Sequence, residues 1–200
     1  MGRAAATAAL DAPNYRDGNY GVGCGASVGK INGMGTAMKA GVGSYAVRIG
    51  ELMVGAIVVV NALGDVFDWR TGRQVAGLLT GDGTALRDTL EYMRGSTRVV
   101  ENRFTGNTTL AVVMTNARFD KARLCKIAGM AHDGYARSIR PVHTSADGDS
   151  IYAVSVGDVA ADQDLVGALA AEVVSGAILR AVESAEGAHG LRAARDLAKG

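Results

Sequence analysis

Four consecutive residues near the middle of the chain, Gly106-Asn107-Thr108-Thr109, have the types and order needed for covalent chemistry. Gly and Asn supply turn chemistry just before an apolar run, Leu110 to Met114. An internal threonine hydroxyl is a poor nucleophile, whereas a threonine hydroxyl beside its own free amine is an established one. If the Asn107–Thr108 bond were cut, Thr108 would become a chain terminus that carries a hydroxyl and a free amine on one residue.

The acidic turn Asp147-Gly148-Asp149 is a second candidate for chemistry. Alone, such a sequence is typical of a surface turn, and it lacks the downstream ligands of a calcium loop. Two carboxylates close to a hydroxyl nucleophile would instead orient it and hold a nearby amine. This interpretation requires Thr108 and Asp147 to lie at neighbouring strand ends, which one strand and one helix between them would allow.

Lys30 and Asn61 are two further polar candidates. Lys30 considered alone is typical of a solvated surface charge. Asn61 follows a long apolar run, so its amide must find hydrogen-bond partners. Two roles fit it equally well from the sequence: donation to a developing oxyanion, or capping of the next turn.

Other sites suggested by the sequence fail on spacing. The run Gly25 to Lys30 is followed by Ile31, where a phosphate-binding loop needs Ser or Thr. His132 would serve as a base or a metal ligand, but it shares no ligand spacing with His143 or His189, which favours a structural hydrogen-bonded histidine. We therefore predict neither a cofactor nor a metal.

Composition limits the class of protein. The 200 residues are 48% hydrophobic and 20% charged, which suits one globular domain with a substantial core. A net charge of +1 without a Lys/Arg block predicts no nucleic-acid or membrane partner. The absence of a signal-like start and of an uninterrupted apolar run of ~18 residues favours a cytoplasmic location. Nine of the 28 glycines lie between Gly18 and Gly43.

The periodicity predicts a layered α/β domain in which helices pack on sheets. We expect residues 1–17 to be a lead-in, 18–184 a single domain and 185–200 a tail. The mixed polar stretch 65–98 should be surface structure. The run 52–61 is continuously apolar, which predicts a strand buried on both faces. The expected strands are 39–48, 52–61, 110–116 and 151–156, the first two forming a hairpin, and the expected helices are 84–93, 120–139 and 162–184.

The spacing of apolar residues also predicts which helix faces are buried. Cys125 falls on the apolar side of its helix, so we expect a buried free thiol. The expected buried positions are Ala122, Leu124, Ile127, Ala128, Ala131, Tyr135 and Ile139 in the first long helix, and Leu165, Leu169, Val173, Ala177, Ile178 and Val182 in the second.

The ordered set of segments resembles one family of self-cleaving N-terminal-nucleophile hydrolases. That family includes L-aminopeptidase/D-esterases, β-peptidyl aminopeptidases and nylon-oligomer (6-aminohexanoate oligomer) hydrolases. The Asn–Thr junction and the Asp-Gly-Asp turn are most similar to the nylon-oligomer branch. The segments that carry the resemblance are Gly25–Lys30, Val58–Asp65, Gly106–Ala117, Met130–Thr144 and Asp147–Asp149.

The resemblance implies a four-layer αββα sandwich and a site centred on Thr108. In the nylon-oligomer branch a lysine, an asparagine and two aspartates accompany the threonine, and they match Lys30, Asn61, Asp147 and Asp149. The implied activity is hydrolysis of linear amide oligomers such as 6-aminohexanoate oligomers after cleavage at Asn107–Thr108. The implied assembly is a homo-oligomer of cleaved two-chain units acting on a small amide or peptide, with no cofactor.

One departure from the family pattern leaves other functions open. Family members carry a further segment before the glycine-rich run, with strands and a tyrosine near the site, whereas this chain starts almost at that run. Neither Tyr15 nor Tyr20 matches that tyrosine. We therefore expect a fragment, a late start or a short form. The alternatives are an aminopeptidase on small N-terminal residues, and an inactive truncated paralogue that serves as an oligomer subunit.

Overall fold

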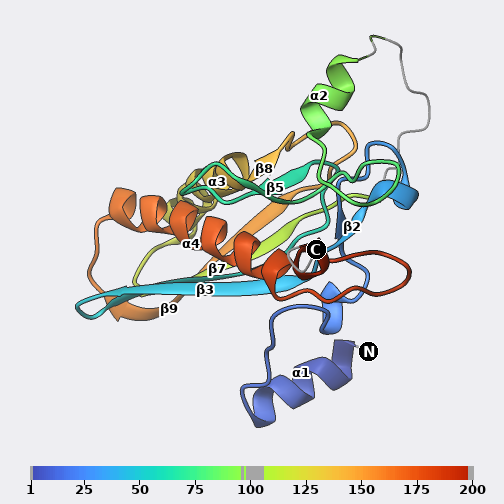
Figure 1. The fold of residues 1–200 in the computed structure, drawn as a ribbon. Coiled ribbons are helices and arrows are strands. Elements are labelled where there is room, and N and C mark those ends of the chain that lie inside the picture. Colours follow the sequence, from blue (N-terminus) through green and yellow to red (C-terminus); the bar gives the residue numbers. More distant parts are fainter. Residues whose placement is uncertain (1, 96, 98–105, 198–200) are drawn as a thin grey trace.

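The fold is built on a four-stranded sheet with two long helices on one of its faces (Figure 1). The computed structural model describes residues 2–95, 97 and 106–197. In the order β3-β4-β7-β9, the strands of this main sheet are β3 (Val42–Ile49), β4 (Leu52–Val59), β7 (Leu110–Ala117) and β9 (Ser150–Val159).

The strand pairing explains how distant segments come together. The predicted hairpin is confirmed, since β3 and β4 pair antiparallel from Val42↔Val59 to Ile49↔Leu52. Gly50, with φ 59°, supplies the left-handed backbone that the two-residue turn needs. Strand β7 pairs antiparallel with β4 and parallel with β9, so it lies in the interior of the sheet. The start of β7, just after Thr108, therefore lies beside the end of β4 and the start of β9.

Two helices form the layer that covers the sheet. They are α3 (Lys121–Ser138) and α4 (Gln163–Glu183), close to the predicted helices 120–139 and 162–184. Each begins at an aspartate that caps it: Asp120 accepts from the backbone of Arg123, and Asp162 accepts from two backbone N–H groups of its first turn. Among the described residues, α4 is the one helix long and apolar enough to cross a membrane, but 67% of its apolar window is buried inside the protein.

Small residues let these layers approach closely. A Cβ on Gly134 of α3 would lie 2.5 Å from the Ala171 carbonyl oxygen of α4. A Cβ on Gly43 of β3 would lie 2.1 Å from the Ala177 carbonyl oxygen of the same helix. A larger residue at either position would clash with α4, so these two glycines set how closely the helix packs on its neighbours.

Parts of the predicted helix faces were wrong. Cys125 is exposed rather than buried, and Ala122 is exposed as well. In α4, Leu165 is 43% exposed, and the buried stripe includes its neighbour Val166 instead. Helix α4 is apolar around most of its surface, so its sequence pattern does not fix which face turns inward.

The remaining elements surround the end of the main sheet near Thr108. A small sheet has the order β6-β5-β8, and β1 pairs with β2. Their bounds, with those of the short helices, are α1 (Gly2–Asp11), η1 (Gly21–Gly23), β1 (Ser27–Val28), η2 (Met34–Thr36), β2 (Met38–Lys39), β5 (Asp65–Phe67), β6 (Gln74–Ala76), α2 (Thr89–Arg94), β8 (Ile139–Arg140) and α5 (Ala194–Leu197).

The prediction of surface structure over 65–98 was wrong at its start, and the predicted helix 84–93 begins later, at Thr89. Asp65 is fully buried and accepts hydrogen bonds from the backbone of Leu78 and from the backbone and hydroxyl of Thr89. Its carboxylate thus ties β5 to α2. The lead-in contains helix α1. Residues 98–105, which precede the candidate junction, lie outside the described residues.

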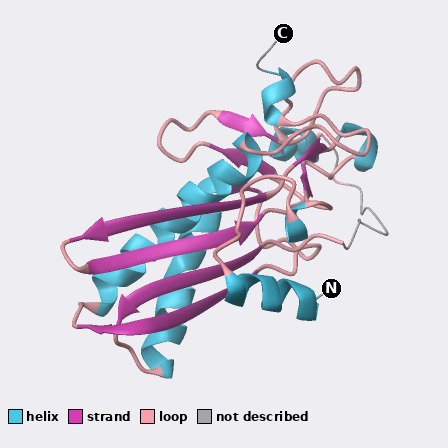
Figure 2. Ribbon diagram, turned by 90° about the horizontal axis from the view of Figure 1, so that it is seen from below, coloured by secondary structure: helices cyan, strands magenta, loops and turns pink. Residues whose placement is uncertain are grey.

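Within the part of the chain that the structure describes, one face of the main sheet carries no helix (Figure 2). The α/β class is confirmed, but two-sided burial of β4 was wrong: its residues alternate between buried positions and positions such as Met53, which is 48% exposed. Strands β7 and β9 alternate in the same way. The outward apolar side chains, here called the open face, are Met53, Ile57, Val59, Leu110, Val112, Met114, Tyr152, Val154 and Val156.

Candidate active site

Thr108 lies where the loop after β4, the loop before β9 and the start of β7 meet. Its backbone N–H donates to the Asn61 carbonyl oxygen at 2.8 Å. The residue before it, Asn107, forms a parallel bridge with Asp147. The acidic turn and the threonine are therefore brought together, as the hypothesis for this site requires.

The two carboxylates of the turn bind different partners near Thr108. Asp149 accepts from the Thr109 N–H at 2.9 Å, and its side chain is only 2% exposed. Asp147 accepts from the Leu63 N–H at 3.2 Å and from the Thr144 hydroxyl at 2.6 Å. In the uncut chain Asp149 thus fixes the residue after Thr108, Asp147 ties the turn to Leu63, and the Thr108 N–H donates to the Asn61 carbonyl oxygen.

Asn61 connects the glycine-rich segment with the residues before Thr108. Its side-chain oxygen accepts from the Lys30 ammonium at 2.6 Å and from the Ser27 N–H at 3.3 Å. Its side-chain nitrogen donates to the Gly106 carbonyl oxygen at 2.8 Å. The sequence left an oxyanion donor and a turn cap as equal choices for this amide. In the uncut chain the amide instead holds the segment that leads to Asn107.

The expectation that Lys30 is a solvated charge was wrong. Lys30 is only 2% exposed, and its neighbours Val28 and Ser27 are buried too. Burial lowers the pKa of the Lys30 ammonium to about 8, while the Asp147 carboxylate acts in the opposite direction and raises it. A lysine with such a pKa can give up or accept a proton near neutral pH.

The carbonyl oxygen of the Asn107–Thr108 peptide bond accepts two hydrogen bonds. The Thr108 hydroxyl oxygen lies 2.5 Å from the Asn107 carbonyl oxygen, to which it donates. The Gly148 N–H donates to the same carbonyl oxygen at 2.9 Å. The Asn107 side chain is buried, with 1% of the residue exposed, and its nitrogen donates to the Ala146 carbonyl oxygen at 3.2 Å. The backbone N–H of Gly148 was not among the predicted site groups, because a backbone contact leaves no residue-type signal.

Two histidines, His143 and His132, extend the hydrogen-bond network from the Asp149 carboxylate. The Nδ1 atom of His143 lies 2.9 Å from the Asp149 carboxylate, and its Nε2 atom lies 3.1 Å from Nδ1 of His132. Partial burial lowers the pKa of His132, and the nearby His143 lowers it further. The Tyr135 hydroxyl donates at 3.2 Å to both the Thr109 and the Ser150 carbonyl oxygens. His132 is thus hydrogen-bonded, the alternative that the sequence favoured.

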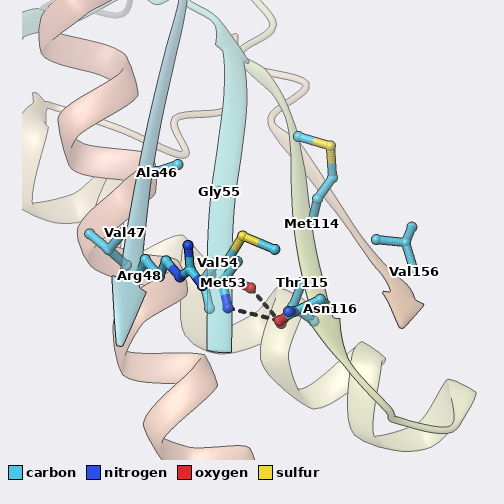
Figure 3. Close-up of a pocket in the computed structure, with 10 residues that line it drawn as sticks. All are labelled: Ala46, Val47, Arg48, Met53, Val54, Gly55, Met114, Thr115, Asn116 and Val156. Atoms are coloured by element: carbon cyan, nitrogen blue, oxygen red, sulfur yellow. Dashed lines mark hydrogen bonds between the residues drawn. The ribbon is translucent and has the colours of Figure 1, made fainter. Parts of the chain in front are cut away.

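An open hollow of about 310 Å³ lies on the sheet away from this cluster (Figure 3). Met53, Met114 and Val156 line it, and the Asn116 side chain accepts from the Met53 N–H at 2.7 Å beside it. Met114 is six residues along β7 from Thr108, which corresponds to about 20 Å of extended strand. This hollow therefore belongs to the open face and not to the candidate site.

Known proteins resemble the chain along nearly its whole length. The model of a family described as Peptidase family S58 matches residues 1–195. An uncharacterized aminopeptidase of Mycobacterium leprae (strain TN) is 34% identical over 209 residues, which cover 96% of this chain and 57% of the relative. A 6-aminohexanoate-oligomer endohydrolase of Agromyces sp. (strain KY5R) is 30% identical over 196 residues, which cover 90% of this chain and 54% of the relative.

Solved structures share the fold. The PH0078 protein from Pyrococcus horikoshii OT3 superimposes with a TM-score of 0.63 at 20% identity, covering 98% of this chain and 54% of the other. The L-aminopeptidase D-Ala-esterase/amidase from Ochrobactrum anthropi, described as a variant of the Ntn-hydrolase fold, gives a TM-score of 0.59 at 23% identity, covering 94% and 51%. The predicted N-terminal-nucleophile-like fold is thereby confirmed. The chain spans little more than half the length of the proteins it matches.

Proposed function

Because the chain belongs to peptidase family S58, whose model matches residues 1–195, we propose that it is an amide-bond hydrolase activated by self-cleavage between Asn107 and Thr108. The observation that carries the proposal is the position of the Thr108 hydroxyl, 2.5 Å from the Asn107 carbonyl oxygen and within one polar cluster. Relatives named as an aminopeptidase and as a 6-aminohexanoate-oligomer endohydrolase support amide chemistry.

The first reaction occurs within the chain. The Thr108 hydroxyl oxygen attacks the Asn107 carbonyl carbon, the C–N bond breaks, and the hydroxyl proton ends on the nitrogen that becomes the Thr108 amine. Water then hydrolyses the resulting ester, which restores the hydroxyl and leaves a carboxylate on Asn107. The products are the chains 1–107 and 108–200.

Later reactions use the new chain terminus. An α-amine has a pKa of about 7.7–8.0, so much of it is neutral near pH 7 and accepts the hydroxyl proton during attack on a substrate amide. Asp147 and Asp149 align that amine, and Lys30 acts through Asn61 to favour its neutral form. The Asn61 amide, once released from Gly106, donates to the substrate oxyanion, a contact worth roughly 3–4 kcal/mol in comparable sites.

Mass analysis of matched variants tests the self-cleavage. The wild-type protein should give two chains, and Thr108→Ala should stay at the full 20.5 kDa because it has no hydroxyl. The matched control Thr108→Ser should still cut itself, since only a methyl group is lost. A folded wild-type protein that stays in one piece, or a Thr108→Ala protein that is cut and active, would overturn the proposal.

The substrate class distinguishes two forms of the proposal. Linear amides such as 6-aminohexanoate oligomers are the first choice, because the Asn–Thr junction resembles that branch. The second choice is an aminopeptidase on small N-terminal residues, which the 34% identity to a protein of that name favours. Cleaved protein incubated with a 6-aminohexanoate oligomer and, separately, with aminoacyl amides would separate them. A homo-oligomer of cleaved two-chain units, a cytoplasmic location, and the absence of nucleic-acid or membrane partners all stay predictions.

A further inference from the structure

The groups that hold Asn107 define where the acyl half of a substrate binds. We propose that the pocket now filled by the Asn107 side chain is the acyl subsite of the hydrolase, that it accepts short side chains able to donate a hydrogen bond, and that the Gly148 N–H stabilises the oxyanion. The inference rests on the proposed function and adds to it a preferred class of substrate.

The acyl group of Asn107 in self-cleavage and the acyl group of a substrate occupy the same position, because both become attached to the Thr108 hydroxyl. Self-cleavage passes through an ester between the Thr108 hydroxyl and the Asn107 acyl group, and substrate hydrolysis passes through an ester between the same hydroxyl and the substrate's acyl group. The hydroxyl cannot move far between the two reactions, because Thr109 is fully buried. Its N–H donates to Asp149, and its carbonyl oxygen accepts from the Ser150 N–H at 3.0 Å.

The oxygen of the acyl group already has a donor. Gly148 N–H points at the Asn107 carbonyl oxygen from 2.9 Å, the distance expected for an oxyanion contact. Asp147 and Asp149 flank Gly148, and their hydrogen bonds to Leu63 and Thr109 hold the turn in place. A preorganised donor of this kind costs no rearrangement when negative charge develops on the oxygen.

Glycine is required at this position for a steric reason. A Cβ on residue 148 would lie 2.8 Å from the Thr108 hydroxyl oxygen, closer than real Cβ contacts allow. Its φ is not in the left-handed region, so the backbone alone would accept alanine. The absence of a side chain therefore makes space for the nucleophile beside the oxyanion donor.

The side-chain pocket has a polar preference. The residue Asn107 is 1% exposed, and its amide nitrogen donates to the main-chain carbonyl oxygen of Ala146. A leucine there would leave that buried carbonyl oxygen without its amide donor, and an aspartate would place a negative charge against it. Among α-aminoacyl groups, the pocket should therefore prefer asparaginyl over leucyl or aspartyl side chains.

One panel of variants and one panel of substrates test the subsite together. The variants Asn107→Asp and Asn107→Leu are compared with wild type for the rate of self-cleavage, followed by intact mass in freshly synthesised protein. Cleaved wild-type protein is then given p-nitroanilides with asparaginyl, aspartyl or leucyl acyl groups, both N-acetylated and with a free amine. We expect the asparaginyl member to be fastest in both panels, by roughly tenfold or more.

The outcomes separate this inference from the proposed function. A wild-type protein that cuts itself but hydrolyses leucyl or aspartyl amides as fast as asparaginyl ones, or none of the series, would overturn the acyl subsite alone. A folded wild-type protein that neither cuts itself nor hydrolyses any amide would overturn both.

A glycine substitution tests the oxyanion donor. Gly148→Ala should slow both reactions by roughly tenfold or more, because the added Cβ would push apart the Gly148 N–H and the Thr108 hydroxyl. Gly81→Ala is the matched control, since a Cβ there meets nothing within 4 Å, and it should leave both rates unchanged. Circular dichroism of both variants checks that they fold. A folded Gly148→Ala protein with wild-type rates would contradict the assignment.

Discussion

The Lys30 ammonium is held away from water by the glycine-rich segment, with the Asn61 side-chain oxygen 2.6 Å away. Burial disfavours its charge, so its pKa in the folded protein, about 8, lies below the ordinary 10.5. Between these two values the unfolded chain binds more protons than the folded chain, so the free energy of unfolding rises with pH across that window. Below about pH 8 the buried charge makes folding less favourable.

This difference predicts a measurable pH dependence of stability. In the uncut Thr108→Ala background, replacing Lys30 by methionine should remove about 2 kcal/mol of the rise in unfolding free energy between pH 7.5 and pH 9.5. Urea denaturation at both pH values measures it. Lys126→Met, at an exposed position on α3, is the control and should keep the rise. Equal slopes for Lys30→Met and Lys126→Met would show that Lys30 is charged and solvated after all.

The polar side chains of the site could be predicted from sequence, but their environment could not. The Asn–Thr junction and the acidic turn are unusual residue combinations, so they could be singled out as candidates without coordinates. The burial of Lys30 depends on how residues 27–30 pack against Asn61, more than thirty residues away. The Gly148 N–H and the His143 contact to Asp149 depend on backbone positions, which no residue type encodes.

At the scale of elements, strand β7 has one face covered by the helices and one face that is exposed. Val113 is 1% exposed and faces the helices, whereas the adjacent Val112 is 39% exposed and belongs to the open face. The sequence predicted the hairpin and both long helices within a few residues, because turn and capping signals are local. It did not predict the exposed side of β4, since a continuous apolar run has no alternation that would reveal it.

Two substitutions on this one strand measure the asymmetry. Val113→Ala should lower the free energy of unfolding by about 2–3 kcal/mol, because it leaves a cavity against the helices. Val112→Ala removes the same atoms from a partly solvated position and should cost under about 1 kcal/mol. Chemical denaturation in the Thr108→Ala background gives both values. Similar losses for the two variants would mean that the open face is covered in solution.

At the scale of the whole molecule, the proposed cut would divide the fold between two chains without dividing its core. Residues 1–107 would carry β3 and β4, and residues 108–200 would carry β7, β9 and both long helices. Strand β7 keeps its ladder with β4 from Val54↔Thr115 to Val59↔Leu110. Gly43 of the first chain also stays packed on α4 of the second.

The two cleaved chains should therefore remain associated. Size-exclusion chromatography of the cleaved protein should give one native peak that contains both chains, and only denaturant should separate them. Uncut Thr108→Ala provides the reference peak and should elute at the same position. Elution of either chain alone under native conditions would contradict this account of a shared core.

The open face has a consequence for the proposed catalysis. Thr108 precedes Leu110 and Val112 by even steps along the strand direction, so the alternation of β7 places it on the side of those exposed residues. A layer of protein that covered this apolar surface as far as Leu110 would therefore also lie next to Thr108. In the proposed enzyme, a layer that covers the apolar surface would also limit how a substrate reaches Thr108. A substitution that loosens this layer would then change both substrate access and the exposure of the surface.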